Sequence, residues 1–242
     1  MSGPLLQATG LCAWYGAAQV LRGVDLQVGP GEVVALLGRN GAGKSTTLKA
    51  LMGLLPRRAG RVTLRGQDIS RAPPHRVARL GLGYVPEDRR IFTDLTVLEN
   101  LEVGRQPPRV GADGQVLPPW TPERLFRLFP NLGEMPDRPG GRMSGGEQQM
   151  LTVARTLMGN PAVLLLDEPS EGVAPLIVEQ MAAAVLELKR QGVAVLLSEQ
   201  NPHFAGWVAD RAYVLEQGEL RWQGAMAALA ADEELRRAWL AV

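Results

Sequence analysis

One segment constrains the fold of this chain more than any other. Over residues 33–52 an apolar run, a glycine-rich loop and a helix-like stretch follow one another, and the loop at 38–45 reads Gly-Arg-Asn-Gly-Ala-Gly-Lys-Ser. Its glycines permit a tight backbone path with amide groups pointing inward, and the start of the helix adds positive potential. A plain glycine turn does not require lysine and serine at this offset, so the segment predicts a phosphate-binding loop.

Two side chains of this loop have predicted tasks. Lys44 supplies a mobile positive charge for the outer phosphates of a nucleotide, and Ser45 offers a hydroxyl to Mg2+. The residues that we expect to contact the nucleotide here are Gly38, Arg39, Asn40, Gly41, Ala42, Gly43, Lys44, Ser45 and Thr46.

A second segment ends in two neighbouring carboxylates. The apolar run at 161–166 leads into Asp167 and Glu168, at the strand end where open α/β sheets place their ligands. Asp167 is expected to hold Mg2+ indirectly, and Glu168 to polarise the water that attacks the γ-phosphate. An ordinary acidic turn is the alternative, but it leaves the phosphate-binding loop without the metal and water positioning that phosphoryl transfer requires.

Composition limits the classes of partner. The 242 residues suffice for one large or two smaller domains, and a formal net charge of +1 provides no basic field for nucleic acid. The single cysteine, Cys12, excludes an internal disulfide. The amino terminus lacks the pattern of a secretion signal, and no aliphatic run approaches the roughly 20 residues that span a bilayer as a helix. If the protein works at a membrane, we expect another subunit to hold it there.

Apolar runs alternate with helix-like stretches along much of the chain, which predicts an α/β core with a mostly parallel sheet. An antiparallel portion is expected before it, a hairpin at 211–222, and short helices over the last twenty residues. The stretch from about 87 to 160 is mostly helical, apart from a surface loop rich in proline and glycine at 106–120. The core strands are expected at 33–37, 82–85, 163–166 and 193–197, and the antiparallel ones at 11–28 and 61–65.

A third motif, Met-Ser-Gly-Gly-Glu-Gln-Gln, occupies residues 143–149 before a helix-like stretch at 148–157. Ser144 suits a helix N-cap, and Glu147 three residues later completes a capping box. Two small glycines at a capped helix start also make an anion site.

The order of these motifs resembles one known family over nearly the whole chain. The phosphate-binding loop, the Ser-Gly-Gly-Glu-Gln segment and the Leu-Leu-Leu-Asp-Glu-Pro segment are similar to those of ATP-binding cassette (ABC) proteins. The resemblance implies an α/β fold of the P-loop NTPase, ABC ATPase type, in a single domain. A RecA-like core, with a mostly parallel sheet and the antiparallel β portion, is expected at about 1–86 and 160–242, and a helical subdomain at about 87–159.

The resemblance also implies ATP and Mg2+ as cofactors and ATP hydrolysis as the activity. Its catalytic residues would be Glu168, Lys44 and Gln200, and its metal residues Ser45, Glu87 and Asp167. In a head-to-tail dimer, the segment Ser144, Gly145, Gly146 and Glu147 of one subunit would close on the γ-phosphate held by the other. Tyr15 matches the family's adenine-stacking aromatic, and a tyrosine of the core is the alternative.

Three positions depart from the family's usual pattern. Glu87 replaces a glutamine, and its carboxylate contacts Mg2+ or its water without donating a hydrogen bond. Gln200 replaces the switch histidine, so an amide that never becomes a cation faces the γ-phosphate. Ala174 replaces the aspartate of the loop after Glu168, and His203 is expected on a helix surface. We expect hydrolysis to be retained, because the main catalytic and metal residues are all present.

Together these departures resemble one branch, the shorter ATPase subunit of bacterial high-affinity branched-chain amino-acid importers. The similar segments are 85–92, 95–101, 168–175 and 199–201, whereas Asp88 and the proline-rich stretch at 107–119 differ from that branch. The resemblance implies a second ABC ATPase subunit, in a heterodimer or a homodimer, with two permease subunits and, indirectly, an extracytoplasmic solute-binding protein. It also implies a peripheral location on the cytoplasmic face of the bacterial inner membrane and no nucleic-acid partner.

Other functions stay open at this point. A closely similar branch imports urea and short amides, and another amino acid is a further possibility. A soluble ABC ATPase that acts on ribosomes or DNA fits the sequence less well. Such proteins typically carry two cassettes in one chain or a long coiled-coil insertion, whereas this chain has one P-loop and no sustained heptads. A nucleotide-sensing subunit is the last alternative.

A permease is expected to contact the surface around residues 87–99, with Phe92, Leu95, Val97 and Leu98 facing it. Packing within the helical subdomain explains Leu95 and Leu98 equally well.

Overall fold

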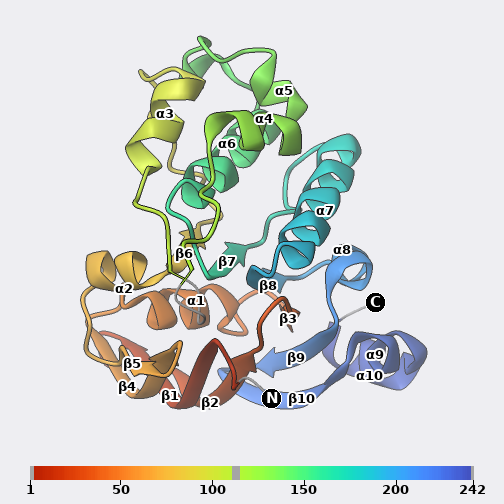
Figure 1. The fold of residues 1–242 in the computed structure, drawn as a ribbon. Helices are drawn as coiled ribbons and strands as arrows, with labels where there is room; N and C mark the ends of the chain where they lie inside the picture. Colours follow the sequence, from red (N-terminus) through yellow and green to blue (C-terminus); the bar gives the residue numbers. More distant parts are fainter. Residues whose placement is uncertain (1–2, 111–114, 241–242) are drawn as a thin grey trace.

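The structure, a computed structural model, describes residues 3–110 and 115–240. Figure 1 shows a lower part that holds both β-sheets and an upper part of helices, from α3 (Val97–Gly104) to α6 (Gly145–Leu157). The chain leaves the lower part after β6 (Leu82–Val85) and returns to it at β7 (Val163–Asp167), and these two strands are neighbours. In the described residues, no helix combines the length and the apolar character needed to cross a bilayer.

A six-stranded sheet forms the centre of the lower part. Its order is β10-β9-β3-β8-β7-β6, and only β10 pairs with its neighbour in an antiparallel manner. The predicted core strands and the predicted hairpin of β9 and β10 are confirmed, with small shifts at their ends. The remaining strands of this sheet are β3 (Val33–Leu37), β8 (Ala194–Glu199), β9 (Arg211–Glu216) and β10 (Glu219–Ala225).

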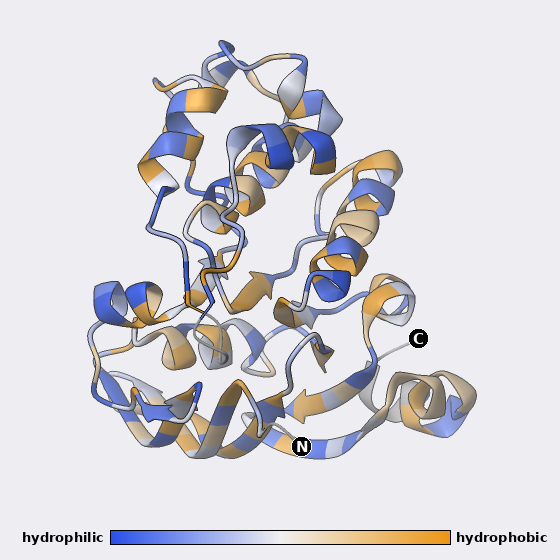
Figure 2. Cartoon of the chain, in the orientation of Figure 1, coloured by the Kyte–Doolittle hydropathy of each residue, from blue (hydrophilic) through white to orange (hydrophobic). Residues whose placement is uncertain are grey.

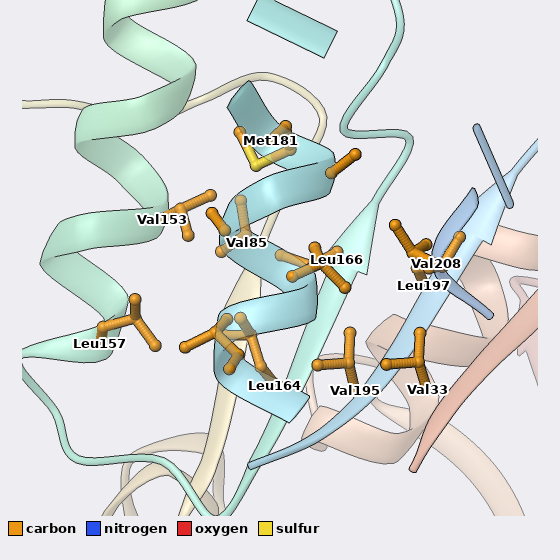
Figure 3. Packing of buried hydrophobic residues seen from close by; sticks show 14 of the residues in the cluster. Val33, Val85, Val153, Leu157, Leu164, Leu166, Met181, Val195, Leu197 and Val208 are labelled. Atoms are coloured by element: carbon orange, nitrogen blue, oxygen red, sulfur yellow. The ribbon is translucent and has the colours of Figure 1, made fainter. Parts of the chain in front are cut away.

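The side chains of the central strands alternate between two hydrophobic cores. Val34 and Leu36 of β3 belong to the cluster around α1 (Lys44–Met52), and Val33 and Leu37 belong to the cluster beneath α6 and α7 (Pro175–Arg190). Figure 3 shows the second cluster, in which α6 and α7 cover the row of side chains from β7, β8 and β3. Because both faces of the sheet are covered, these strands have uninterrupted apolar runs. In the strands of the first sheet, hydrophobic and hydrophilic residues alternate (Figure 2).

The first sheet is antiparallel, with the order β2-β1-β4-β5, and lies against the face of the central sheet that carries α1. The antiparallel portion predicted from residues 11–28 and 61–65 is therefore confirmed, although its strands begin earlier. Cys12 is half-buried in the first of them. The strands are β1 (Leu6–Tyr15), β2 (Ala18–Val28), β4 (Arg57–Leu64) and β5 (Gln67–Asp68).

The helical part is organised around one buried amide. Asn100 of α3 is completely buried, accepts a hydrogen bond from the Phe92 N–H at 3.0 Å, and donates to the carbonyls of Phe92, Leu95 and Thr96 at 2.9–3.1 Å. It thereby fixes the loop that precedes α3. The other elements here are α4 (Pro122–Leu128), α5 (Pro130–Gly133) and a 3-10 turn, η1 (Gly140–Arg142).

Four helices surround the carboxyl-terminal strands. α7 begins at Pro175, a residue whose missing N–H costs nothing in a first turn, and it has the cations Lys189 and Arg190 in its last turn. The predicted terminal helices are α9 (Met226–Ala231) and α10 (Glu233–Leu240). The short helix α2 (Pro74–Leu80) was not predicted by the sequence patterns, whereas α8 (Pro202–Val208) carries His203 on an exposed helix surface as expected.

Replacing Asn100 with Asp tests the buried amide. The variant has almost the same shape but turns two N–H donors into acceptors that face three carbonyls, so we expect a loss of about 1–3 kcal/mol in the free energy of unfolding. Urea denaturation measures it, with Asn131→Asp as the control, since Asn131 makes only one long contact, to Gln180 at 3.5 Å. Equal stability of the two variants would contradict the proposed organising role.

Candidate functional site

The glycine-rich loop runs from the end of β3 to the start of α1, pressed against neighbouring strands. Gly38 has φ 153°, and a Cβ there would lie 2.3 Å from the Leu215 carbonyl oxygen of β9. Gly43 has φ 109°, and a Cβ there would lie 2.9 Å from the side chain of Leu21. No side chain caps the start of α1, which leaves its first N–H groups for an anionic ligand.

Lys44 is the buried centre of this loop. Its ammonium donates to the carbonyls of Gly38 at 2.9 Å and Arg39 at 3.3 Å, and its Nζ lies 3.1 Å from Glu168 Oε1. Both side chains of the ion pair are less than a tenth exposed. The two residues that sequence analysis assigned to phosphate binding and to water activation therefore meet directly.

The strand order explains this meeting. β8 lies between β3 and β7, with Leu37 of β3 opposite Glu199 and Asp167 of β7 opposite Ser198. The strands are parallel, so the loop after β3, the carboxylates after β7 and Gln200 after β8 all emerge at one edge of the sheet.

Asp167 is held by two hydroxyl groups. Ser198 donates to Oδ1 at 2.6 Å and Tyr84 donates to Oδ2 at 2.9 Å, while the carboxylate itself is 1% exposed. Burial and the nearby Asp167 raise the pKa of Tyr84, which keeps its hydroxyl protonated as a donor. Glu168 follows in a strained backbone conformation, φ 48°, with its N–H bonded to the Ser198 carbonyl at 3.0 Å.

Glu199 is a buried carboxylate that the sequence motifs did not single out. It is 1% exposed, and it accepts the N–H of Ser170 at 3.1 Å and the N–H of Asn201 at 3.3 Å. The side chain thus connects the loop after Glu168 with the loop that carries Gln200. Burial raises the pKa of Glu199 to about 7, against the opposing effect of these two hydrogen bonds. The available sequence signal was the segment 199–201, which resembles the importer branch but gives Glu199 no role of its own.

Further carboxylates face the loop across a pocket of about 370 Å³. Glu87, Glu168 and Glu171 line one side, and the loop from Asn40 to Thr46 lines the other. A hydrogen bond to Glu168, partial burial and the neighbouring acids raise the pKa of Glu171 to about 7. This concentration of negative charge beside an anion-binding loop is suited to a bound cation.

The donor set suits Mg2+ rather than a metal held by protein alone. Among the described residues, no cluster of three or more acidic, histidine or cysteine side chains has the geometry of a complete metal site. The Ser45 hydroxyl and Glu87 line the pocket, while Asp167 is already engaged by two hydroxyls and acts from behind them. Mg2+ prefers few protein ligands plus water and phosphate oxygens, so the residues present fit this ion.

The Ser-Gly-Gly-Glu-Gln motif begins α6, in the helical part. The predicted capping box is confirmed: the Ser144 Oγ accepts the Glu147 N–H at 3.3 Å, and Glu147 accepts the Ser144 N–H at 2.7 Å. Gly145 and Gly146 pack closely under the side chains of Arg89 and Ile177, where a Cβ would lie 2.6–2.7 Å from them. None of the four motif residues, Ser144 to Glu147, lines the pocket at Lys44.

Tyr15 and Gln200 also lie outside the lining of that pocket. Tyr15 ends β1 with 49% of its surface exposed, so it is not a buried core residue and its ring is free to stack on a planar group. Gln200 is exposed directly after β8. The roles predicted for both residues stay predictions.

Two groups of named relatives match nearly the whole chain. The high-affinity branched-chain amino acid transport ATP-binding protein BraG of Pseudomonas aeruginosa is 40% identical over 241 residues, which cover 98% of this chain and 99% of BraG. The lipopolysaccharide export system ATP-binding protein LptB of Escherichia coli is 35% identical over 97% of this chain and 96% of LptB.

Solved structures of similar fold include two ATP-binding cassettes of ABC transporters. A nucleotide-free cassette matches with a TM-score of 0.79 and 27% identity, covering 96% of this chain and 97% of its own. A cassette in its ADP conformation matches with a TM-score of 0.78 and 27% identity, covering 97% and 98%. The predicted α/β fold of the ABC ATPase type is confirmed.

The family model of the ABC transporter matches residues 21–171, from β2 through the phosphate-binding loop and the capped motif to the loop after Glu168. With the nearly full-length relatives, this match establishes that the chain belongs to the ABC transporter family as an ATPase subunit that is coupled to transport.

Proposed function

We propose that this chain is the ATP-hydrolysing subunit of an importer for branched-chain amino acids. The observation that carries the proposal is the 40% identity to BraG over almost the full length of both chains. The sequence segments around Glu87 and Gln200, which are similar to that branch, support it. Export of lipopolysaccharide is the second candidate, because LptB is 35% identical over a similar length.

The proposed mechanism begins with competition for Lys44. Phosphate oxygens of ATP take the ammonium that Glu168 now holds at 3.1 Å, so the carboxylate becomes free to orient and polarise the attacking water. Ser45 and Glu87, which line the pocket, and Asp167 would hold Mg2+, which would supply charge neutralisation on the phosphates.

Glu199 connects two loops of the site. Its hydrogen bonds join the loop after Glu168 to the residues around Gln200, so a contact of Gln200 with the γ-phosphate would be transmitted to the loop that carries the base.

A dimer supplies the remaining parts of the site. Ser144, Gly145, Gly146 and Glu147 of one subunit close on the nucleotide of the other, and Tyr15 stacks on its adenine. The separation of this segment from the pocket at Lys44 within one chain supports the arrangement. The partner is a second ABC ATPase subunit, and the core at about 1–86 and 160–242 moves against the helical subdomain at about 87–159.

The permease docks where the two parts meet. A hollow of about 610 Å³ there is lined by exposed Leu54, Phe92 and Val103, and Leu98 is exposed nearby on α3. Val97, which was expected to face the permease, is instead completely buried in the core of the helical part. In the first turn of α3, the side chain of Val97 points into the core, whereas the side chain of the next residue, Leu98, points to solvent. Docking on two permease subunits places the chain on the cytoplasmic face of the inner membrane, and a solute-binding protein completes the system.

Removal of Lys44 tests the ion pair and the phosphate site separately. Lys44→Ala leaves the buried Glu168 without its cationic partner, so we expect about 3–5 kcal/mol lower stability, together with ATP affinity reduced roughly tenfold or more. The double variant Lys44→Ala, Glu168→Gln should recover stability but not ATP affinity. Denaturation and isothermal titration measure the two effects, and Lys49→Ala on the same helix is the control. Unchanged ATP affinity in Lys44→Ala would contradict the assignment.

The raised pKa of Glu199 predicts a pH effect on stability. The native state keeps the proton up to about pH 7, whereas the unfolded chain releases it near 4.5. The contribution of Glu199 to the free energy of unfolding therefore declines as pH rises from about 4.5 to about 7, by roughly 1–3 kcal/mol. Glu199→Gln should remove this decline, and the exposed Glu179→Gln should not. Urea denaturation at several pH values in this range measures the free energy of unfolding. Parallel plots of this free energy against pH for wild type and Glu199→Gln would refute the raised pKa.

The transported solute is tested in cells that lack this chain. We expect the loss of high-affinity leucine uptake, restoration by the wild-type chain, and copurification of two polytopic proteins and a second cassette ATPase from gently solubilised membranes. Normal leucine uptake together with failed lipopolysaccharide export would favour the second candidate. Loss of urea uptake alone would point to the amide-importing branch.

A further inference from the structure

The proline-rich stretch at 106–120 is held at both ends by one buried residue. Asn160, 7% exposed and with φ 51°, accepts the Trp120 N–H at 2.8 Å and donates to the carbonyls of Gln106 at 2.8 Å and Pro107 at 3.3 Å. Between these ends, Leu117 N–H bonds to the Arg109 carbonyl at 2.7 Å. The described residues of this stretch, 106–110 and 115–120, therefore form a folded arm, which we call the 106–120 arm.

The residues of this arm around Arg109 pack on the core. Figure 1 shows the chain between α3 and α4 descending towards α2. Arg109 of the arm donates to the Leu80 carbonyl of the core at 3.2 Å, and Arg65 of the core donates to the Val110 carbonyl of the arm at 3.0 Å. Gly81 makes room for this contact, because a Cβ there would overlap the Arg109 guanidinium. The sequence predicts a surface loop within the helical subdomain. The structure differs in that the described residues around Arg109 lie against the core.

A cleft of about 460 Å³ lies between the arm and the core. It is lined by three arginines, Arg65, Arg109 and Arg124, and by no carboxylate among the described residues. Its walls are otherwise mainly apolar: Leu5, Leu117, Pro118, Trp120, Pro161 and Val193.

The three arginines are not equivalent. Arg124 stacks on Trp120 and donates to the carbonyls of Pro118 and Pro119 and to Gln191, so its role is structural. Arg65 and Arg109 form no ion pair with any described residue, and the buried Nε of Arg109 has no hydrogen-bond partner. Burial and the neighbouring Arg65 lower the pKa of Arg109 to about 10. Two guanidinium groups without an ion-pair partner among the described residues, one of them partly buried, beside a partly apolar hollow favour an anion.

The cleft is separate from the nucleotide site. Pro161 and Val193 lie just before β7 and β8, so the cleft is at the amino ends of the strands whose carboxyl ends carry Glu168 and Gln200. The two pockets share no lining residue. An anion in the cleft is therefore a different ligand from the nucleotide.

We propose that this cleft binds a small organic anion with an apolar body, in which a carboxylate or phosphate group pairs with Arg65 and Arg109. A free inorganic anion would leave the apolar walls uncovered, and a neutral apolar molecule would leave the two guanidinium groups unpaired. A volume of about 460 Å³ is in the range of small-molecule sites. The anion would join the arm to the core, since Arg109 belongs to one and Arg65 to the other.

The indole N–H signal of Trp120 in two-dimensional NMR reports on this cleft, and a Trp120→Phe variant assigns it. Saturating ADP and Mg2+ are present, so that the phosphate-binding loop does not capture the probes. Four probes are titrated to roughly 10 mM, a range suited to ligands of this size: phenylacetate, phenyl phosphate, benzyl alcohol and inorganic phosphate. We expect a saturable shift with phenylacetate or phenyl phosphate, and which of the two binds more tightly identifies the anionic group.

Matched variants show whether the arginines cause the binding. Arg109→Gln and, separately, Arg65→Gln should weaken the binding of the organic anion roughly tenfold or more. Arg105→Gln is the control, because Arg105 is exposed, is paired with Glu102 and lies outside the cleft. No shift with either organic anion, an equal response to benzyl alcohol, or undiminished binding in a folded Arg65→Gln variant would overturn the proposal.

Discussion

The site depends on a buried ion pair that joins two loops of one sheet edge. Lys44 Nζ and Glu168 Oε1 lie 3.1 Å apart, and the ammonium also donates to the carbonyls of Gly38 and Arg39. Removing either charge alone is costly in such a setting, whereas replacing one partner of the pair by a phosphate is not. The pair therefore has the properties of a contact that the nucleotide exchanges for its own. It exists only because β8 separates β3 from β7 in a parallel sheet.

The regular parts of this fold and the main motifs could be predicted because their signals are local. The loop at 38–45 requires glycines where φ is positive, the uninterrupted apolar runs follow from burial on both faces, and Ser144 and Glu147 form a capping box within four residues. Each of these rules acts between residues that are near in the sequence.

The residues that were missed make polar contacts that no local sequence pattern predicts. Asn100 and Asn160 bind backbone groups of loops, Glu199 joins the loop after Glu168 to that of Gln200, and Arg109 reaches Leu80. A single Asn, Glu or Arg carries no pattern that predicts burial, because these residues are normally exposed. Val97 was misassigned for a related reason: periodicity identifies an apolar position but not the surface that covers it.

Relatives named for branched-chain amino acid transport and for lipopolysaccharide export match this chain at 40% and 35% identity. In the proposed function, Lys44, Asp167 and Glu168 would carry out the nucleotide chemistry, whereas other subunits would select the solute. Matches of both kinds are consistent with this division of roles.

The most direct test of the account is the rate of ATP hydrolysis by the assembled transporter with Glu168→Gln in this subunit, beside wild type and Glu179→Gln. If Glu168 leaves Lys44 to polarise water, the variant should still bind ATP while its hydrolysis rate at this site falls by roughly 10²-fold or more, and Glu179→Gln should match wild type. A Glu168→Gln enzyme that binds and hydrolyses ATP at the wild-type rate would contradict the catalytic role of the ion pair.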